Sequence, residues 1–586
     1  MQRRRFLSAV AALAGAPAVA RAGDAGRSPA DLIVTGATIH TVDDAFPAPQ
    51  AFCVRGGMFV YVGSRDGAMA LRGPQTQVLD LTGYTVLPGL IDAHLHLTGV
   101  GLDLAEVDLF KLHSYADVVA KTAAFARTSP DAWILGDGWD QNLWPGKAFP
   151  THEPLSAAIP DRPVALSRLD GHAVLANAKA MQLAGVTNST PDHAGGLIVR
   201  DAQGNPTGVF VDNAMDLIYS KVPDPTHQQL VRATRSAIAE CNRWGLTTVA
   251  EPGTNETRLA AHVELIEAGE YSIRNYAMLW DDTALIDKHI QSGIVENAYD
   301  GHLWIRAIKM FADGALGSRG AALLAPYSDD PHNTGLVVTP QAHMQEVTEK
   351  ALRAGFQVCV HAIGDRGNRM VLDACEAALL SVPSHDPRLR IEHAQVLSPQ
   401  DIGRFATLGI IPSMQTTHQI SDMAWAQARL GPERVLGAYA WRSLLDTGVI
   451  VANGTDAPVE AVSTLRTFHA AISRQNERNE PAGGWYPDQR MTRDEALKSM
   501  TIWAARANFQ EKLLGSITPG KYADFVVMDR DWMTAPAESI METRIAATYL
   551  AGQRVYDGSS SAAFERRSKA SRSGCCGHAA LRLRSG

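Results

Sequence analysis

The chain has 586 residues, a length that suggests about four domains, although a (β/α)₈ barrel can exceed about 400 residues as one unit. The hydrophobic fraction of 46% and the charged fraction of 20% exclude disorder, collagen and coiled coil for the bulk of the chain. No apolar run approaches the roughly 20 residues of a membrane span. The net charge of −8 argues against nucleic acid as the main partner.

The two chain ends differ from the body in charge. Residues 1–22 carry Arg3, Arg4, Arg5 and Arg21 without an acid, followed by a short apolar stretch and an A-x-A cleavage pattern. This order predicts an export signal, and its basic start is similar to the twin-arginine signals of bacterial exported proteins, so we expect a periplasmic or exported protein. Residues 558–586 are rich in Ser, Arg and Gly and predict a disordered basic tail.

Short alternating strands with glycine punctuation occupy residues 30–87, and similar segments occupy residues 511–557. Such patterns predict antiparallel strands. The two segments lie at opposite ends of the body, so we expect them to form one small β-sandwich domain. Residues 88–510 would then be a single inserted unit.

Apolar runs separated by longer helical patterns fill residues 88–510. Alternating strands and helices predict an α/β fold with a parallel sheet, and eight strands indicate a (β/α)₈ TIM-like barrel. Residues 97–240 form a large insertion after the first strand, on the catalytic face, where we expect it to cover the site. The eight strand candidates are residues 87–94, 246–250, 275–279, 304–310, 357–361, 389–392, 410–414 and 449–453.

Polar side chains follow several of these predicted strands. The first ends in His94-Leu95-His96, and the two-residue period of a strand places both imidazoles on one face, which makes half of a site for Zn²⁺ or a similar ion. Because the carboxyl ends of barrel strands converge on one face, we expect the other polar residues to join them. These are Lys309, His361, His393 and Asp456.

At these positions the chain resembles the metal-dependent amidohydrolases, specifically the subgroup called amidohydrolase family 3. The matching segments are PGLIDAHLH at 88–96, KMFADGALGSR at 309–319, HAIGD at 361–365, IEHAQ at 391–395, GTDAPV at 454–459 and GSITPGKYAD at 515–524. GWD at 138–140 and DGHA at 170–173 match within the insertion. The resemblance covers roughly residues 30–557.

The resemblance implies a role for each ligand-type residue. His94, His96 and Asp456 would bind one divalent metal, expected to be zinc, and His361 and His393 would bind a second. Lys309 would be carboxylated and bridge the ions. The resemblance does not decide between one and two ions per chain. Metal-activated hydroxide would be the nucleophile, and Asp456 the general acid and base.

Four further residues are candidates for contacting substrate. His172 would help to polarise the carbonyl oxygen, as a second catalytic residue. Trp139 would form an apolar wall, although packing within the insertion is an equal alternative. Arg319 would bind a substrate carboxylate, although a structural ion pair is favoured, and His418 would line the site.

The predicted function is hydrolysis of a C–N bond of an amide, N-acyl or N-formyl compound. A deaminase, a lactonase or esterase, and a non-catalytic regulatory barrel are the alternatives, because one fold supports many chemistries. The predicted partner is a small-molecule substrate, with no nucleic acid and no stable membrane span, and a homodimer is left open.

Overall fold

The computed structural model describes residues 28–558 except 170, 193 and 194. The predicted export signal at 1–22 and all but the first residue of the predicted tail lie outside this part of the chain. The described chain divides into two compact units, of which Val100–Ala233 is one and the flanking sequence on both sides is the other. No helix among the described residues is long and apolar enough to cross a membrane.

A parallel barrel forms the centre of the larger unit. Its strands follow the order β7, β14, β15, β17, β18, β19, β20, β21, and every neighbouring pair is parallel. The Ala93 backbone N–H donates to the Asn453 carbonyl at 3.1 Å, which joins the two ends of this order. The bounds are β7 Leu90–Asp92, β14 Leu246–Thr254, β15 Arg274–Trp280, β17 Leu303–Phe311, β18 Gln357–Ala362, β19 Arg390–His393, β20 Ile411–Met414 and β21 Ala452–Asn453.

The (β/α)₈ TIM-like barrel predicted from sequence is therefore confirmed, with one correction. The predicted first strand at 87–94 is two strands, because Gly89 interrupts it: Leu87 and Pro88 end β6 (Thr85–Pro88) in another sheet, and β7 begins at Leu90. A Cβ at Gly89 would approach Thr247 Oγ1 to 2.3 Å, so the chain can pass from one sheet to the other here only with glycine.

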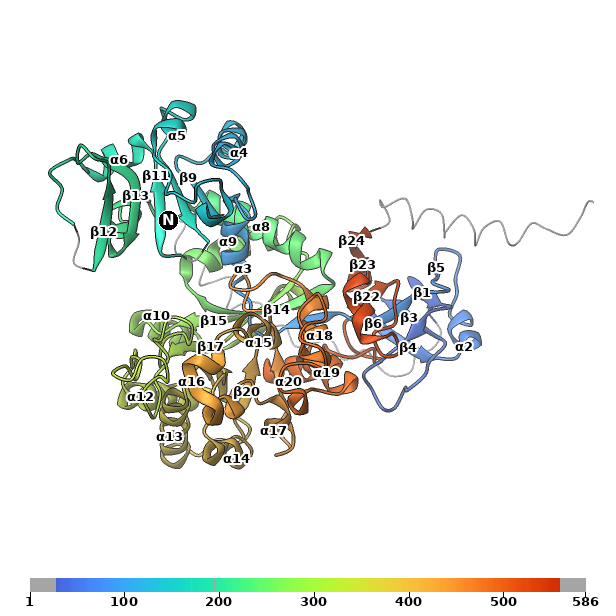
Figure 1. Ribbon diagram of the computed structural model, residues 1–586. Coiled ribbons are helices and arrows are strands. Elements are labelled where there is room, and N and C mark those ends of the chain that lie inside the picture. The colour runs from blue at the N-terminus through green and yellow to red at the C-terminus, as the bar shows by residue number, and fades with distance from the viewer. Residues whose placement is uncertain (1–27, 170, 193–194, 559–586) are drawn as a thin grey trace, which may run out of the picture. The chain divides into compact units, whose positions relative to one another are not determined.

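Helices follow most barrel strands along the chain and cover the barrel (Figure 1). Among them are α9 (Glu256–Glu267) after β14, α10 (Thr283–Ser292) after β15 and α15 (Thr416–Asp422) after β20. Asn255 and Asp282 cap α9 and α10, because their side chains accept the backbone N–H groups of Arg258 and Leu285. Further helices are α8 (His227–Arg243), α12 (Gln341–Ala354), α13 (Asp365–Ser381), α14 (Pro399–Leu408), α18 (Thr464–Ser473) and α20 (Ile502–Ala507).

Two small sheets pack as a sandwich, and the second of them combines strands from both ends of the body. One has the order β4-β3-β1-β5, and the other has the order β2-β6-β22-β23-β24 (Figure 1). They share one buried apolar cluster, in which the Phe52 ring contacts the Phe525 ring at 5.1 Å. The strands are β1 Leu32–Thr35, β2 Thr38–Ile39, β3 Ala51–Arg55, β4 Met58–Gly63, β5 Gln77–Asp80, β22 Phe525–Met528, β23 Ile545–Leu550 and β24 Gln553–Asp557.

The unit Val100–Ala233 has its own mixed sheet, in the order β12-β13-β11-β10-β9-β8. Trp139 and Trp144 stack in its apolar cluster with ring centroids 5.9 Å apart. Its helix α4 (Tyr115–Thr128) begins at Ser114, whose side chain accepts the Asp117 N–H. The strands are β8 Val107–Asp108, β9 Ile134–Trp139, β10 Val164–Arg168, β11 Ala173–Ala176, β12 Gly196–Arg200 and β13 Pro206–Asp212.

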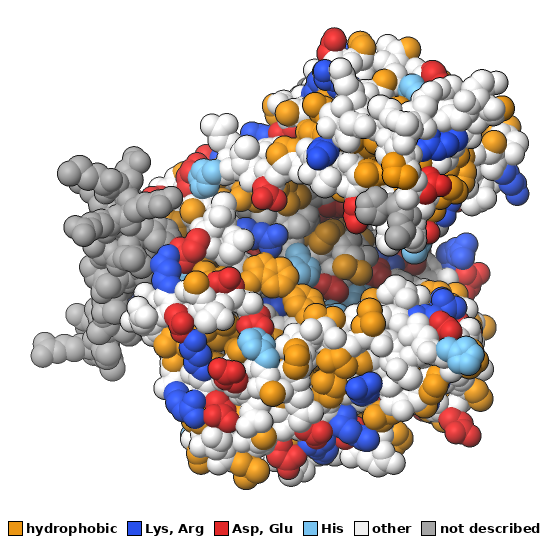
Figure 2. Space-filling view, turned by 90° about the vertical axis from the view of Figure 1, so that its left-hand side faces the viewer, with side chains coloured by type: hydrophobic (Ala, Val, Ile, Leu, Met, Phe, Trp, Pro, Cys, Tyr) orange, Lys and Arg blue, Asp and Glu red, His pale blue; other side chains and the backbone are white. Residues whose placement is uncertain are grey.

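Acidic, basic and apolar side chains are interspersed on the face shown in Figure 2. The described residues on that face form no continuous basic stripe of the kind that follows a nucleic-acid backbone.

Candidate metal centre

Asp456 lies at the centre of a cluster of histidines at the carboxyl ends of the barrel strands. Its Oδ1 lies 3.5 Å from His94 Nε2 and 3.3 Å from His96 Nε2, and its Oδ2 lies 3.5 Å from His418 Nε2. Two groups could each hold an ion, His94–His96–Asp456 and His393–His418–Asp456. The first group contains three of the predicted ligands, and the second places His418 beside the predicted ligand His393.

Three imidazole nitrogens at this centre are buried without a hydrogen-bond partner: His94 Nε2, His361 Nε2 and His418 Nε2. A buried nitrogen without a partner costs free energy unless something else binds it. Burial, followed by the charge of Lys309, lowers the pKa of His94 to about 4 and that of His361 to about 3. Neutral imidazoles are the form that binds metal, so this donor set fits a divalent ion.

His361 lies beside this cluster and outside both groups. Its ring is 4.5 Å from the His393 ring, and its Nε2 is 3.6 Å from Asp313 Oδ1. The Asp313 carboxylate accepts the backbone N–H groups of Ala322, Ile363 and Gly364. Asp313 therefore shapes the loop after β18, next to His361.

Lys309 is 1% exposed on the inner face of β17. Its Nζ lies 4.2 Å from the centre of the Phe311 ring, and it forms no ion pair with the described residues. Burial lowers the pKa of its amine.

Glu392 orients His94 by binding Nδ1, the ring nitrogen that does not face Asp456. Its role was not predicted from the sequence. Its Oε2 accepts from His94 Nδ1 at 2.6 Å, which leaves Nε2 facing Asp456. Burial alone would raise the pKa of Glu392, but Arg390 and His94 outweigh it and hold the pKa at about 2. Carboxylates in this position fix the tautomer of a ligating histidine. Two charged residues in the apolar strand Arg390–His393 are the signal that could have revealed the pair.

Gln415 plays the same part for His393, accepting from its Nδ1 at 2.7 Å. The backbone φ angles are 72° at His393 and 59° at Asp456, in the left-handed region that residues with a Cβ rarely adopt. A strained backbone conformation persists only where the surrounding contacts hold it in place, and such residues are common at functional sites.

Asp92, the last residue of β7, joins the segment that bears His94 to the loop that bears Asp456. Its carboxylate accepts the His94 N–H at 3.0 Å and the Thr455 hydroxyl at 2.7 Å, and the Asp456 N–H donates to the His94 carbonyl at 2.7 Å. Asp92 is 2% exposed, and burial raises its pKa to about 7. These bonds fix the distance between His94 and Asp456.

Three other predicted substrate residues have identifiable contacts within their own units. Trp139 is fully buried in the core of the unit Val100–Ala233, and its indole N–H donates to the Leu166 carbonyl. It therefore offers no face to a substrate, and packing within the insertion is the correct alternative. Arg319 forms an ion pair with Asp329, the structural role favoured from the sequence. His172 lies in the same unit as Trp139, where its Nδ1 is 2.8 Å from Asp212 Oδ1.

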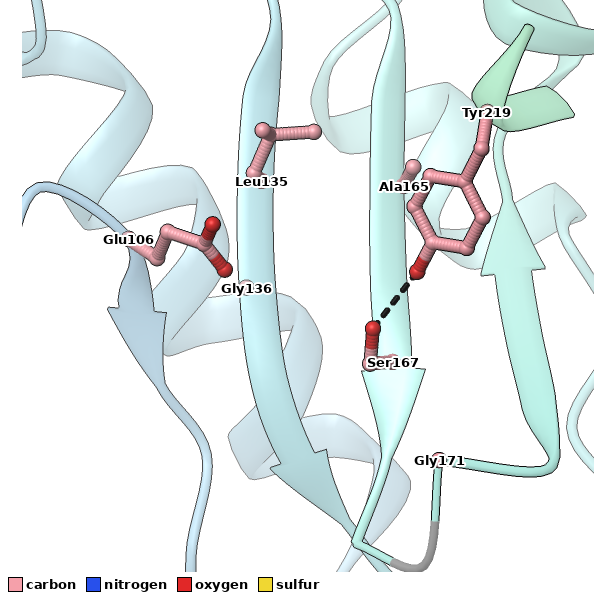
Figure 3. A pocket seen from close by; sticks show the side chains of 7 residues that line it. All are labelled: Glu106, Leu135, Gly136, Ala165, Ser167, Gly171 and Tyr219. Atoms are coloured by element: carbon pink, nitrogen blue, oxygen red, sulfur yellow. Dashed lines mark hydrogen bonds between the residues drawn. The ribbon is translucent and has the colours of Figure 1, made fainter. Parts of the chain in front are cut away.

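A separate polar pocket of about 320 Å³ lies within the unit Val100–Ala233 (Figure 3). Ser167 and Tyr219 hydrogen-bond across one side at 2.5 Å, and the Glu106 carboxylate extends toward Gly136 on β9. Burial, followed by the charges of Asp103 and Asp137, raises the pKa of Glu106 to about 7. This pocket could not be predicted from the sequence, because its lining comes from separate segments of the unit.

Comparison with known proteins identifies the family. Residues 77–556 match the family model described as "Amidohydrolase family". The protein LONG AFTER FAR-RED 3 of Arabidopsis thaliana is 34% identical over 90% of this chain and 92% of its own length. An N-substituted formamide deformylase of Arthrobacter pascens is 27% identical over 90% of this chain and 98% of its own.

A solved structure shares both the fold and part of the sequence. It is a metal-dependent hydrolase of Pyrococcus furiosus, 28% identical, with a TM-score of 0.72 over 86% of this chain and all of that one. The family resemblance seen in the sequence motifs is thereby confirmed. With its barrel, its histidine cluster around Asp456 and a family match across most of its length, the chain belongs to the amidohydrolase family.

Proposed function

We propose that this metal-dependent hydrolase cleaves a C–N bond in an amide, N-acyl or N-formyl compound of low molecular mass. The observation that carries the proposal is that His94 Nε2, His361 Nε2 and His418 Nε2 are buried without a hydrogen-bond partner, the first and last of them 3.5 Å from the Asp456 carboxylate. The activity of the deformylase relative from Arthrobacter pascens is consistent with it.

His94, His96, His393, His418 and Asp456 would hold the metal, with His361 and a carboxylated Lys309 beside them. When bound, a divalent metal such as zinc supplies the Lewis acidity that polarises a carbonyl group and activates water. Burial would raise the pKa of Asp456, but the adjacent histidines outweigh it and hold the pKa well below its ordinary value, so the carboxylate is ionised. It can therefore accept a proton from water and pass it to the leaving nitrogen.

Two residues contribute from outside the ligand set. Glu392 holds the His94 ring in the tautomer that leaves Nε2 free. His172 is proposed to polarise the carbonyl oxygen, with Asp212 fixing its ring. Comparing His172→Gln with His172→Ala tests this role. Glutamine keeps a hydrogen-bond donor and alanine does not, so turnover should be partly retained in the glutamine variant alone.

The test is a hydrolysis screen of the metal-loaded protein against N-formyl compounds, N-acyl amines, cyclic amides, esters and aminopurines. We expect release of amine and carboxylate from an amide substrate, with activity lost on chelation and restored by Zn²⁺ or Mn²⁺. Turnover of aminopurines or of esters and lactones alone would assign the deaminase or the lactonase alternative. Absence of any turnover by protein with full metal content would favour the regulatory barrel.

A further inference from the structure

An aromatic pair lies on the inner face of the barrel mouth, beside the candidate metal centre. Trp280 ends β15 and Phe311 ends β17, and their rings stack with centroids 5.5 Å apart and planes inclined by 24°. The strand register aligns Trp280 with Lys309 and Phe311 with His361, so both rings share the face of those polar side chains. The Phe311 ring lies 5.2 Å from the His361 ring.

A pocket of about 540 Å³ adjoins Trp280 of this pair, between the N-terminal turns of α9 and α10. Trp280, Ala284 and Leu285 supply apolar lining. The charged groups in the lining are already paired, because Lys288 Nζ lies 2.6 Å from Glu256 Oε2. The carboxamide of Asn255 and the carboxylate of Asp282 are occupied in capping α9 and α10. The pocket therefore suits an uncharged apolar group.

The strand order fixes which half of a substrate can reach this pair. In the closed ring β17 lies four places from β21 in either direction, so Phe311 is across the mouth from Asp456, which follows β21. During hydrolysis water adds to the carbonyl carbon, the C–N bond breaks, and the nitrogen takes a proton from Asp456. The nitrogen must face Asp456, and the acyl substituent then extends toward Trp280 and Phe311.

We infer that Trp280 and Phe311 form an acyl-binding wall that selects substrates with an aromatic or branched apolar acyl group. The inference rests on the proposed C–N hydrolase function and adds to it the substrate class. It places the apolar substituent on the carbonyl side of the bond, and so predicts that a formyl group, which has no substituent, is a poor acyl group for this protein.

The test keeps the amine constant and varies the acyl group from formyl to acetyl to phenylacetyl. For the wild type we expect kcat/KM to rise at least about tenfold from acetyl to phenylacetyl, as added apolar contact produces in a specific pocket. Trp280→Ala should abolish most of that ratio. Trp244→Ala is the matched control, because Trp244 is a half-buried tryptophan that precedes β14 at the opposite end of the barrel, and it should keep the wild-type ratio.

A second readout does not depend on turnover. Calorimetric binding of phenylacetate should be at least about tenfold tighter than that of acetate in the wild type, and this difference should shrink in Trp280→Ala. If that variant does not fold, Trp280→Leu and Phe311→Leu replace it, since both keep an apolar side chain of moderate size.

Equal kcat/KM for acetyl and phenylacetyl substrates in an active wild type would overturn the acyl-binding wall, and so would an unchanged ratio in Trp280→Ala. A preference that follows the amine substituent would also overturn it. A metal-loaded wild type that hydrolyses no amide at all would contradict the proposed function instead, so the two failures are distinguishable.

Discussion

Asp456 is the residue on which the candidate site depends most. Its carboxylate lies within 3.5 Å of the Nε2 atoms of His94, His96 and His418. Replacement by asparagine keeps one oxygen that can serve as a ligand but removes the basic carboxylate. We therefore expect Asp456→Asn to lower kcat by about 10²–10⁴-fold, the range for a lost general acid or base, while metal analysis still finds much of the metal bound. Near-normal turnover would refute the proton-transfer role.

Glu392 should control metal affinity without touching the metal. Glu392→Gln weakens the hydrogen bond that fixes His94, and removal of such partners costs about 10–100-fold in metal affinity. Competition with a fluorescent chelator measures this. Asp524→Asn is the matched control, because Asp524 also forms a buried pair with an arginine, Arg274, and has no recorded bond to a histidine of the site. Equal losses of affinity in both variants would point to general destabilisation.

At the scale of the elements, the unit Val100–Ala233 carries a pH-sensitive carboxyl. Burial raises the pKa of Glu106 in the folded protein from its ordinary value of 4.5 to about 7, so the folded state favours the protonated form. The contribution of Glu106 to the stability of the unit is thus fully present below pH about 4.5 and is lost as pH rises toward about 7. We expect the free energy of unfolding of this unit, followed by thermal unfolding, to fall by on the order of 1–3 kcal/mol between about pH 5 and pH 8. The fall should be smaller in Glu106→Gln. An identical shift in the variant would count against this.

The barrel could be predicted from sequence because its strands are short apolar runs separated by helical patterns, and several of them are followed by a polar residue. The convergence of strand ends predicted that His94, His96 and Asp456 lie on one face, and the family resemblance implied that they bind one ion together. The partners behind the ligands could not be predicted. Glu392 reaches His94 across 298 positions of sequence and Gln415 reaches His393 across 22, and such pairs depend on strand register. The choice between a substrate wall and internal packing for Trp139 could not be made from the sequence, because a motif does not show which face of a sheet is buried.

At the scale of the whole molecule, both ends of the body build one sandwich. Phe525 near the carboxyl end contacts Phe52 near the amino end at 5.1 Å and stacks on Tyr549 at 4.3 Å. Phe525→Ala should therefore cost about 3–5 kcal/mol of stability, measured by denaturant unfolding. Leu380→Ala on α13, where the side chain is 79% exposed, is the control and should cost little. Equal stability of both variants would contradict a shared core.

We also propose that residues 1–22 direct export of the folded, metal-loaded protein. N-terminal sequencing of protein isolated from its native cells should begin after Ala22, and Arg4→Lys with Arg5→Lys should leave the protein inside the cell. An intact Met1 on the mature protein would contradict this proposal.

The central claim is that the histidine cluster around Asp456 binds the metal that hydrolysis requires. The most direct measurement is the metal content per chain of the active protein by atomic absorption, taken with amide turnover before chelation, after it and after Zn²⁺ is restored. We predict one or two ions per chain and turnover that rises and falls with them. Full turnover by protein with well under one ion per chain would contradict the account.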